Sequence, residues 1–218
     1  MKEKRGLFIT LEGGEGSGKT SLALSLQEHL EAQGLEVMLT REPGGVSVAE
    51  NIRSVIMSED MDNTTEALLF AAARREHLVK KVLPALEKGI IVICDRFVHS
   101  SLVYQGHVGG LGMEMVFELN QFAIGDLMPD VTLYLDLPAE VGIERIGANP
   151  DREVNRFDEK VIAFHENVRK GYLAIPEHFP EQAFRKMEAS GTKDSVFQSA
   201  IEILQPLLNE HQVSVSSQ

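Results

Sequence analysis

The sequence predicts a single α/β domain built on a five-stranded parallel sheet. Short runs of β-forming residues alternate with longer helical patterns, and four of the five runs are almost continuously apolar. Strands that are buried on both faces have this composition. Alternating strands and helices with short joints indicate right-handed crossover connections. The chain has 218 residues, which is enough for one such domain and short for two.

The predicted strands share β-branched and other apolar residues, and the last of them has the weakest pattern. In chain order they are Leu7–Leu11, Glu36–Thr40, Ile90–Cys94, Val131–Leu135 and Ala183–Met187. The carboxyl ends of parallel strands meet at one edge of a sheet, where ligands bind in open α/β folds. Residues that follow these runs are therefore the first candidates for a functional site.

The helical segments lie between the strands, and several are closed by glycine or proline, which end helices. We expect the second segment to kink or end near Pro84 and the fifth to end at Pro176. The segments are Lys19–Gln33, Thr65–Lys88, Glu114–Ile124, Ala139–Ile146, Asp158–Ile175 and Asp194–Leu208. We expect one domain over residues 1–212, followed by a frayed, disordered tail over residues 213–218.

The polar stretch Gly147–Phe157, "GANPDREVNRF", interrupts this pattern between two helices. It contains Pro150 and two arginines, Arg152 and Arg156. A solvated connector is the common interpretation of such a stretch. A mobile lid is the functional interpretation, and the residues of the stretch do not decide between the two.

Composition limits the possible partners. There are 21 Lys and Arg against 33 Asp and Glu, a net charge of −12. Binding to a nucleic-acid backbone or to an anionic membrane needs clustered positive charge, so we expect neither.

The one cysteine, Cys94, lies in an apolar run and is expected to be buried. No stretch resembles a signal peptide or a transmembrane span, and we expect a cytoplasmic protein.

The stretch "GGEGSGKT" follows the first predicted strand and opens the first predicted helix. It fits the pattern G-x-x-x-x-G-K-[ST] of a phosphate-binding loop. In such a loop the backbone N–H groups and the helix N-terminus face phosphate oxygens. Lys19 reaches the β- and γ-phosphates, and the Thr20 hydroxyl binds Mg²⁺. The predicted ATP-binding residues are Gly13, Gly14, Glu15, Gly16, Ser17, Gly18, Lys19 and Thr20.

Two classes of P-loop protein lack support in this sequence. The tetrapeptide N-K-x-D, which reads guanine in GTPase switches, does not occur. The extra lysine of partitioning ATPases is also missing at the start of the loop. A nucleotide-driven switch without a small-molecule substrate is therefore weakened, although it stays open.

Asp95 and Arg96 follow the third predicted strand. An aspartate at this position can hold Mg²⁺ through water, as a Walker-B residue does. The arginine beside it offers a fork of donors that matches a second phosphate. In another context an Asp-Arg pair is a surface ion pair, but the strand before it favours a ligand site.

Other candidates for the acceptor side lie near the same edge. Arg41 follows the second strand, and Tyr104 and Gln105 follow the Asp-Arg strand. Phe70 and Arg74 share one helix face because they are four residues apart. From spacing alone, core packing for Phe70 and a surface charge for Arg74 explain this pair as well as nucleobase binding does. The seven histidines show no metal-ligand spacing and are interpreted as structural or surface residues.

The motifs in their order resemble those of the thymidylate kinase family, whose members phosphorylate dTMP with ATP. The matching stretches are "LEGGEGSGKT", "REPGG", "LLFAAARREHLV", "CDRFVHSSLVYQG" and "PDVTLYLD". They span residues 7–136, and residues 139–158 also resemble the lid region of that family. The resemblance implies a three-layer fold of the P-loop nucleoside monophosphate kinase type, with a short lid at about residues 147–157.

The resemblance also implies roles for single residues. Glu15 would face the 3′-hydroxyl of dTMP, Phe70 would stack on thymine, and Arg96 would hold the dTMP phosphate. Tyr104 would lie under the sugar and leave little room for a 2′-hydroxyl. The implied dTMP-binding residues are Glu15, Arg41, Pro43, Phe70, Arg74, Arg96, Ser101, Tyr104 and Gln105, with Arg74 and Gln105 at the base edge. The implied Mg²⁺ residues are Thr20 and, through water, Asp95.

Gly16 changes the interpretation of the lid. Some members of the family carry an arginine inside the P-loop at this position, whereas a branch of bacterial members supplies it from the lid. The resemblance to that branch implies that Arg156, and secondarily Arg152, are catalytic together with Lys19, Asp95 and Arg96.

Two alternatives stay open beside dTMP phosphorylation. One is a kinase for another nucleoside monophosphate, such as dUMP or a nucleoside analogue. The other is a P-loop ATPase or binding module. The resemblance further implies a homodimer, with buried helices between Ser47 and Lys88 as candidates for its interface.

Overall fold

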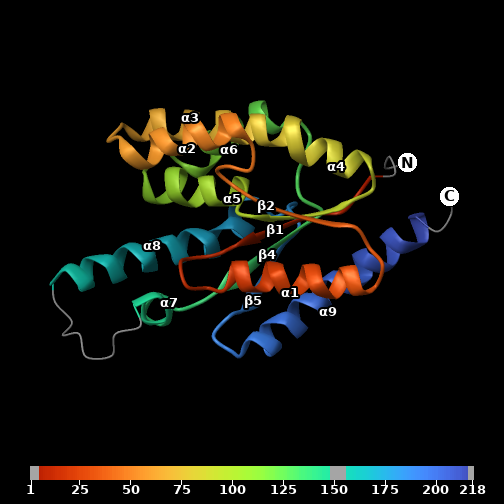
Figure 1. Cartoon of the computed structure of the whole chain (residues 1–218). Helices are drawn as coiled ribbons and strands as arrows, with labels where there is room; N and C mark the ends of the chain where they lie inside the picture. The colour runs from red at the N-terminus through yellow and green to blue at the C-terminus, as the bar shows by residue number, and fades with distance from the viewer. Residues whose placement is uncertain (1–4, 148–155, 216–218) are drawn as a thin grey trace.

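The computed structural model describes residues 5–147 and 156–215, with the side chains of residues 5–147 and 162–211. Five parallel strands form one sheet in the order β2-β3-β1-β4-β5 (Figure 1). The strands are β1 Phe8–Glu12, β2 Val37–Arg41, β3 Ile91–Asp95, β4 Val131–Asp136 and β5 Phe184–Glu188. Each strand begins and ends within one residue of its predicted range. The predicted α/β class with a five-stranded parallel sheet is therefore confirmed.

Helices cover both faces of the sheet, which gives three layers (Figure 1). Helices α1 (Lys19–Ala32) and α9 (Lys193–Val215) pack on one face, and the segments from α3 to α6 pack with α8 on the other. The remaining elements are α2 Ser47–Ser58, α3 Asn63–His77, η1 Leu78–Val82, α4 Leu83–Glu87, α5 Val98–Ser101, η2 Leu102–Val108, α6 Met113–Ile124, α7 Ala139–Gly147 and α8 Arg156–His178.

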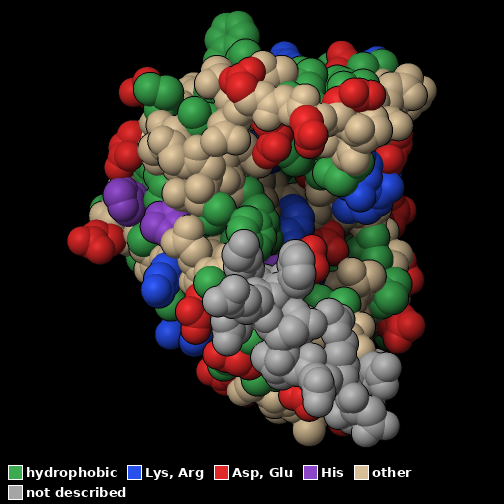
Figure 2. Space-filling model, turned by 90° about the vertical axis from the view of Figure 1, so that its left-hand side faces the viewer, with side chains coloured by type: hydrophobic (Ala, Val, Ile, Leu, Met, Phe, Trp, Pro, Cys, Tyr) green, Lys and Arg blue, Asp and Glu red, His purple; other side chains and the backbone are tan. Residues whose placement is uncertain are grey.

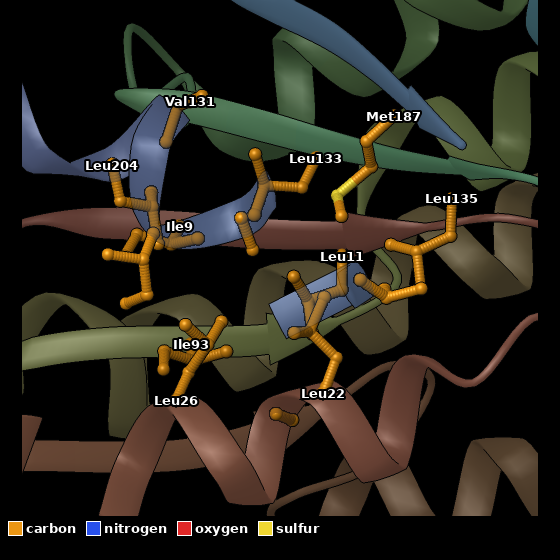
Figure 3. Packing of buried hydrophobic residues seen from close by; sticks show 14 of the residues in the cluster. Ile9, Leu11, Leu22, Leu26, Ile93, Val131, Leu133, Leu135, Met187 and Leu204 are labelled. Carbon is orange, nitrogen blue, oxygen red and sulfur yellow. The ribbon is translucent and has the colours of Figure 1, made fainter. Parts of the chain in front are cut away.

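Alternation along the strands divides the core into two clusters. Ile9 and Leu11 of β1 belong to the cluster on the face that α1 and α9 cover, together with Leu22, Leu26 and Leu204 (Figure 3). Phe8 points to the opposite face and belongs to the second cluster. Successive side chains of a strand point to opposite faces, and both faces are apolar because helices cover both. The whole of β1 is buried, which fixes the strand that leads into the P-loop.

The predicted helix Thr65–Lys88 is divided into three parts. It contains α3, the π-helical segment η1 and α4, and Pro84 lies in the first turn of α4. Proline cannot donate the hydrogen bond that an α-helix needs at this point, and a π-helical segment changes the backbone register just before it. The hydrogen-bond pattern of the helix therefore changes just before Pro84, the position at which a kink or an end was expected.

Two helices are longer than expected, and three elements were not predicted. Helix α8 contains Pro176 and ends at His178, because the buried Ile175 and Phe179 hold its last turn against the core. Helix α9 continues to Val215, so residues 213–215 are helical and not a frayed tail. The apolar pattern did not predict α2, α5 or η2. The resemblance implied buried helices from Ser47 onward, but α2 is mostly exposed in the monomer. Ala49 is the one buried residue of α2, so its apolar spacing does not mark a face toward the core.

The register brings the carboxyl ends of β1, β3 and β4 to one edge of the sheet. Leu11 is paired with Asp95 on one side and with Leu133 on the other. The P-loop leaves β1 at this edge, on the side from which α8 also projects (Figure 1). Within the described residues, none of the helices has the length and apolar character required to cross a membrane.

Candidate active site at the carboxyl edge of the sheet

The P-loop between β1 and α1 needs glycine at positions that a side chain could not occupy. Gly13 and Gly16 have φ angles of 150° and 69°. A Cβ atom at Gly13 would lie 2.8 Å from the carbonyl oxygen of Leu135, and one at Gly16 would lie 2.3 Å from that of Gly142. The loop is therefore held between β4 and α7, with its backbone turned as phosphate binding requires.

Lys19 lies inside this loop. Its Nζ atom donates to the carbonyl oxygens of Gly13 and Gly14 at 3.1 and 2.9 Å, and it contacts Ser17 Oγ at 3.3 Å. Burial lowers the pKa of Lys19 to about 8, because desolvation penalises the ammonium form. The side chain thus points into the loop, and its charge has no carboxylate at ion-pair distance among the described residues.

Thr20 and Asp95 form the expected oxygen-rich pair. The Thr20 hydroxyl donates to Asp95 Oδ2 at 3.2 Å, and Asp95 lies at the end of β3. The other carboxylate oxygen, Asp95 Oδ1, is buried, and none of the described residues donates to it. Buried carboxylate oxygens without partners are rare in folded proteins, and hard divalent cations prefer oxygen ligands. These two residues therefore fit Mg²⁺ with its water shell.

A cavity of about 400 Å³ lies beside the P-loop. Figure 2 looks onto this edge of the molecule and shows a hollow with basic and acidic side chains along its margin. All of the residues implied to bind dTMP, except Arg41, line this cavity. They are Glu15, Pro43, Phe70, Arg74, Arg96, Ser101, Tyr104 and Gln105. Segments far apart in the sequence are thus brought to one site.

Arg41 lies outside this cavity. Its side chain is about half exposed and forms an ion pair with Glu50 at 3.0 Å. It lines an adjoining hollow of about 300 Å³ together with Lys19, Thr20 and Asp95. Arg53 of α2 lines both the cavity and this hollow, and it was not among the predicted site residues. Its helix carries little buried surface, so no core pattern in the sequence pointed to it.

Arg96 connects the cavity with the hollow over the P-loop, because it lines both. Its φ angle is 70°, an unusual conformation for a residue other than glycine. Its Nη1 atom donates to Ser100 Oγ at 3.1 Å and contacts Tyr172 Oη at 3.3 Å. Its guanidinium lies 5.2 Å from the ring centroid of Tyr104. The surroundings therefore hold the guanidinium between the two spaces.

The buried carboxylate of Glu12 is linked to Arg96 through the hydroxyl groups of Ser100 and Tyr172. Glu12, the last residue of β1, accepts hydrogen bonds from Ser100 Oγ at 2.6 Å, from Tyr172 Oη at 2.9 Å and from the Phe97 N–H at 2.8 Å. Burial raises the pKa of Glu12, and the hydrogen bond from Ser100 opposes this shift. The network joins the residue before the P-loop to Arg96 and to α8, and sequence reasoning missed it.

Arg74 is buried, so its interpretation as a surface charge is wrong. Its side chain is 2% exposed, and its Nε atom donates to Glu42 at 2.7 Å. Its other N–H groups donate to Ser101 Oγ twice, to the Phe97 carbonyl and to Asn120 Oδ1. Every donor of the guanidinium therefore has a protein acceptor. A ligand in the cavity can gain a donor from Arg74 only by replacing one of them, and Ser101 accepts two.

The histidines that touch this region are structural, as expected. His77 is fully buried between Thr40 Oγ1 at 2.7 Å and Glu42 Oε1 at 2.9 Å. Burial lowers the pKa of His99 to about 4. Among the described residues no group of three or more His, Cys, Asp or Glu side chains could hold a metal ion. Cys94 is buried and unpaired, as expected.

A second cavity, of about 490 Å³, lies on the outer side of the P-loop, and sequence reasoning did not predict it. Arg145 of α7 spans it, donating to the Ala189 and Ser190 carbonyls at 3.0 and 3.2 Å and contacting the Gly16 carbonyl at 3.4 Å. Its lining includes Leu22, Val196 and Phe197. A flat apolar group bound here would lie next to the phosphate-binding loop.

The structure does not describe the side chains of the two predicted lid arginines. Arg152 lies outside the described residues, and Arg156 begins α8 with its side chain outside them. Their role stays a prediction.

Comparisons with known proteins agree with this geometry. The family model described as thymidylate kinase matches residues 11–199. A thymidylate kinase of Bacillus velezensis is 51% identical over 211 residues, covering 95% of this chain and 99% of that protein. One of Oceanobacillus iheyensis is 50% identical, with coverage of 94% and 92%. The crystal structure of thymidylate kinase from Ehrlichia chaffeensis matches with a TM-score of 0.72 and 33% identity, covering 92% of this chain and 98% of that one. The chain therefore belongs to the thymidylate kinase family.

Proposed function

We propose that the chain transfers the γ-phosphoryl group of ATP to dTMP and produces ADP and dTDP. One observation carries this proposal. The cavity of about 400 Å³ has Phe70 and Gln105 among its lining residues and meets the P-loop hollow at Arg96 and Glu15. A nucleoside monophosphate placed with its base against Phe70 and its phosphate at Arg96 faces the loop that binds ATP phosphates.

The reaction needs no strong base on the protein. An oxygen of the dTMP phosphate attacks the γ-phosphorus of ATP, and the bond from that phosphorus to the β-phosphate bridging oxygen breaks. The attacking oxygen is already anionic, so catalysis consists of positioning and charge stabilisation. Arg96 orients the acceptor phosphate, and Lys19 contacts the transferred group.

Mg²⁺, when bound near Thr20 and Asp95, neutralises charge on the ATP phosphates. The other residues act on the nucleosides. Tyr104 supports the sugar and stacks on Arg96, and Glu15 lies where the 3′-hydroxyl would be bound. We place the adenine of ATP in the second cavity, beside Phe197 and Arg145, because that cavity adjoins the outer side of the P-loop.

A coupled assay of ADP formation across dTMP, dUMP, dCMP, UMP and no acceptor tests the proposal. Turnover that requires dTMP supports it. Preferential turnover of a different monophosphate would assign another kinase activity, and equal ADP formation without any acceptor would assign an ATPase.

We also propose that two copies form a homodimer through α2, α3 and α6. These helices expose apolar side chains in the monomer: Val55 and Met57 on α2, Leu68 on α3, and Met115 and Phe122 on α6. Phe122 is 93% exposed. The described part of α2 is thus mostly exposed and not buried in its own chain, which suits an interface with a second copy.

The activity and the buried, unpaired Cys94 are consistent with a cytoplasmic enzyme.

A further inference from the structure

Gln105 is held by a carboxylate that belongs to the same cavity. It lies in η2, and its side chain is buried. Its Nε2 atom donates to Glu66 Oε1 at 2.7 Å, and Glu66 is in the first turn of α3. Both side chains line the cavity in which Phe70 lies. This contact has no part in the proposed chemistry described above.

The contact determines which way the amide of Gln105 is turned. A carboxylate accepts hydrogen bonds and donates none, so the NH₂ group must face Glu66. The carbonyl oxygen, Oε1, then points away from Glu66. Among the described residues none donates to Gln105 Oε1, and it is not among the buried oxygens without a partner. A hydrogen-bond acceptor is therefore left for a ligand in the cavity.

We infer that Glu66 is a positioning residue that makes the site select pyrimidines with an N–H at ring position 3. Thymine and uracil carry this N–H, and Gln105 Oε1 accepts from it. Cytosine has a lone pair at the same position, which would face the lone pairs of Oε1. Binding of cytosine would therefore place its ring acceptor opposite Gln105 Oε1, with no hydrogen bond between them. Sites that leave a buried polar group unsatisfied in this way discriminate strongly between ligands. The inference rests on the proposed function, because it assumes that the base lies beside Phe70.

The variant Glu66→Gln tests this with a side chain of the same shape. A glutamine at position 66 both donates and accepts, so the amide of Gln105 is free to turn its NH₂ toward the ligand. The ratio of kcat/KM for dTMP to that for dCMP should fall by at least about tenfold. Loss on dTMP should be seen mainly in KM, because the base is held equally in the ground state and the transition state. The ratio for dTMP to dUMP should not change, since both bases carry the N–H and differ only in a methyl group.

The matched control is Glu28→Gln, the same exchange at an exposed position of α1 outside the cavity, which should leave all ratios as they are. In a Gln105→Ala background, Glu66→Gln should have no further effect on the dTMP to dCMP ratio, because Glu66 acts through Gln105. Calorimetric affinities for dTMP and dCMP give the same ratio without turnover.

An unchanged dTMP to dCMP ratio in Glu66→Gln, with dTMP still used by the unmodified enzyme, overturns the inference and leaves the proposed function standing. An equal fall of the ratio in the Gln105→Ala background also overturns it. An unmodified enzyme that does not use dTMP overturns the proposed function itself and the inference with it.

Discussion

The hydroxyl of Tyr172 donates a hydrogen bond of 2.9 Å to the buried carboxylate of Glu12, 160 positions away in the sequence. Glu12 precedes the P-loop, and Tyr172 belongs to α8, the helix that follows the expected lid. The same hydroxyl lies 3.3 Å from Arg96 Nη1. The Tyr172 side chain thus connects α8 with the residue that precedes the P-loop and with the arginine proposed to hold the acceptor phosphate.

The variant Tyr172→Phe should therefore lose both stability and turnover. Removing a buried hydrogen bond to a charged group costs about 1–3 kcal/mol in the free energy of unfolding. Arg96 also loses a neighbour that restrains it, and we expect kcat to fall by about tenfold, since a small displacement of a positioning group is costly. Urea denaturation and steady-state kinetics measure the two effects.

The control for this variant is Tyr134→Phe. The Tyr134 hydroxyl donates to Asp136 at 3.2 Å, and its ring stacks on Tyr172 at 4.8 Å. This exchange should lower stability without lowering kcat. Equal kcat in Tyr172→Phe and in the unmodified enzyme would show that the hydroxyl does not position Arg96.

Lys19→Ala should abolish transfer and leave the fold intact. In the free enzyme the pKa of Lys19 is about 8, so kcat/KM for ATP should decline above pH 8 as the ammonium loses its proton. The folded-state pKa lies below the ordinary value of 10.5. Between these two values the unfolded chain binds more protons, so the contribution of Lys19 to stability should rise with pH.

Thermal melting from pH 7 to pH 10.5 checks this sign, because Lys19→Ala should lack that rise. A Lys19→Ala enzyme with near-normal turnover would remove the residue from the phosphate site.

Tyr104→Ala should relax discrimination against ribonucleotides. The ring lines the acceptor cavity beside Arg96. We expect the preference for dTMP over UMP to fall by about tenfold or more, while the preference for dTMP over dUMP, which depends on one methyl group, changes less. The turnover of dTMP should also fall, because Arg96 loses the ring under its guanidinium.

Tyr104→Phe keeps the ring and should retain the sugar preference, which makes it the matched control. A preference for dTMP over UMP that survives in Tyr104→Ala would mean that another group excludes the 2′-hydroxyl.

Arg156→Ala should lower kcat by about 10²–10³-fold or more with little change in the affinity for dTMP. The resemblance implies that this arginine comes from the lid, and a lid arginine would contact the transferred group mainly in the transition state. Arg152→Ala should show a smaller loss of the same kind. An unchanged kcat in Arg156→Ala would return residues 147–157 to the role of a solvated connector.

A second substitution, Gly16→Arg, would add an arginine to the P-loop of Arg156→Ala, but we do not expect it to restore turnover. The φ angle of Gly16 is 69°, and a Cβ atom there would meet the Gly142 carbonyl oxygen at 2.3 Å. Gly16→Arg should therefore disturb the loop and fail to restore activity.

Phe122→Asp should weaken the proposed homodimer. Phe122 is 93% exposed on α6, and loss of a central aromatic residue commonly costs 2 kcal/mol or more of binding free energy, about thirtyfold or more in the dissociation constant. Sedimentation velocity over a range of concentrations measures the shift toward monomer. Phe164→Asp on α8, away from the proposed interface, provides the control, since Phe164 is also exposed at 44%. Equal dissociation constants for both variants would exclude this face of the molecule.

Local patterns determined the sheet, the P-loop and the Asp-Arg pair. Apolar runs of about five residues separated by helical patterns indicate buried parallel strands, and each strand was found within one residue of its predicted range. The phosphate-binding loop is a contiguous stretch, so its spacing is visible in the sequence. The end of a strand is also a local property, which is why Asp95 and Arg96 could be placed at the carboxyl edge.

The tertiary structure alone decided how these parts are held. Arg74 appeared as a surface charge from its spacing, whereas it is buried because Glu42, Ser101 and Asn120 converge on it from other elements. Arg53 enters the site on a helix that buries little of its own surface. Gly16 excludes a side chain because α7 returns to within contact of the loop. Such contacts join segments that are tens to more than a hundred residues apart, and hydrogen bonding and burial at that range depend on the packing of whole elements, which no local pattern of residues records.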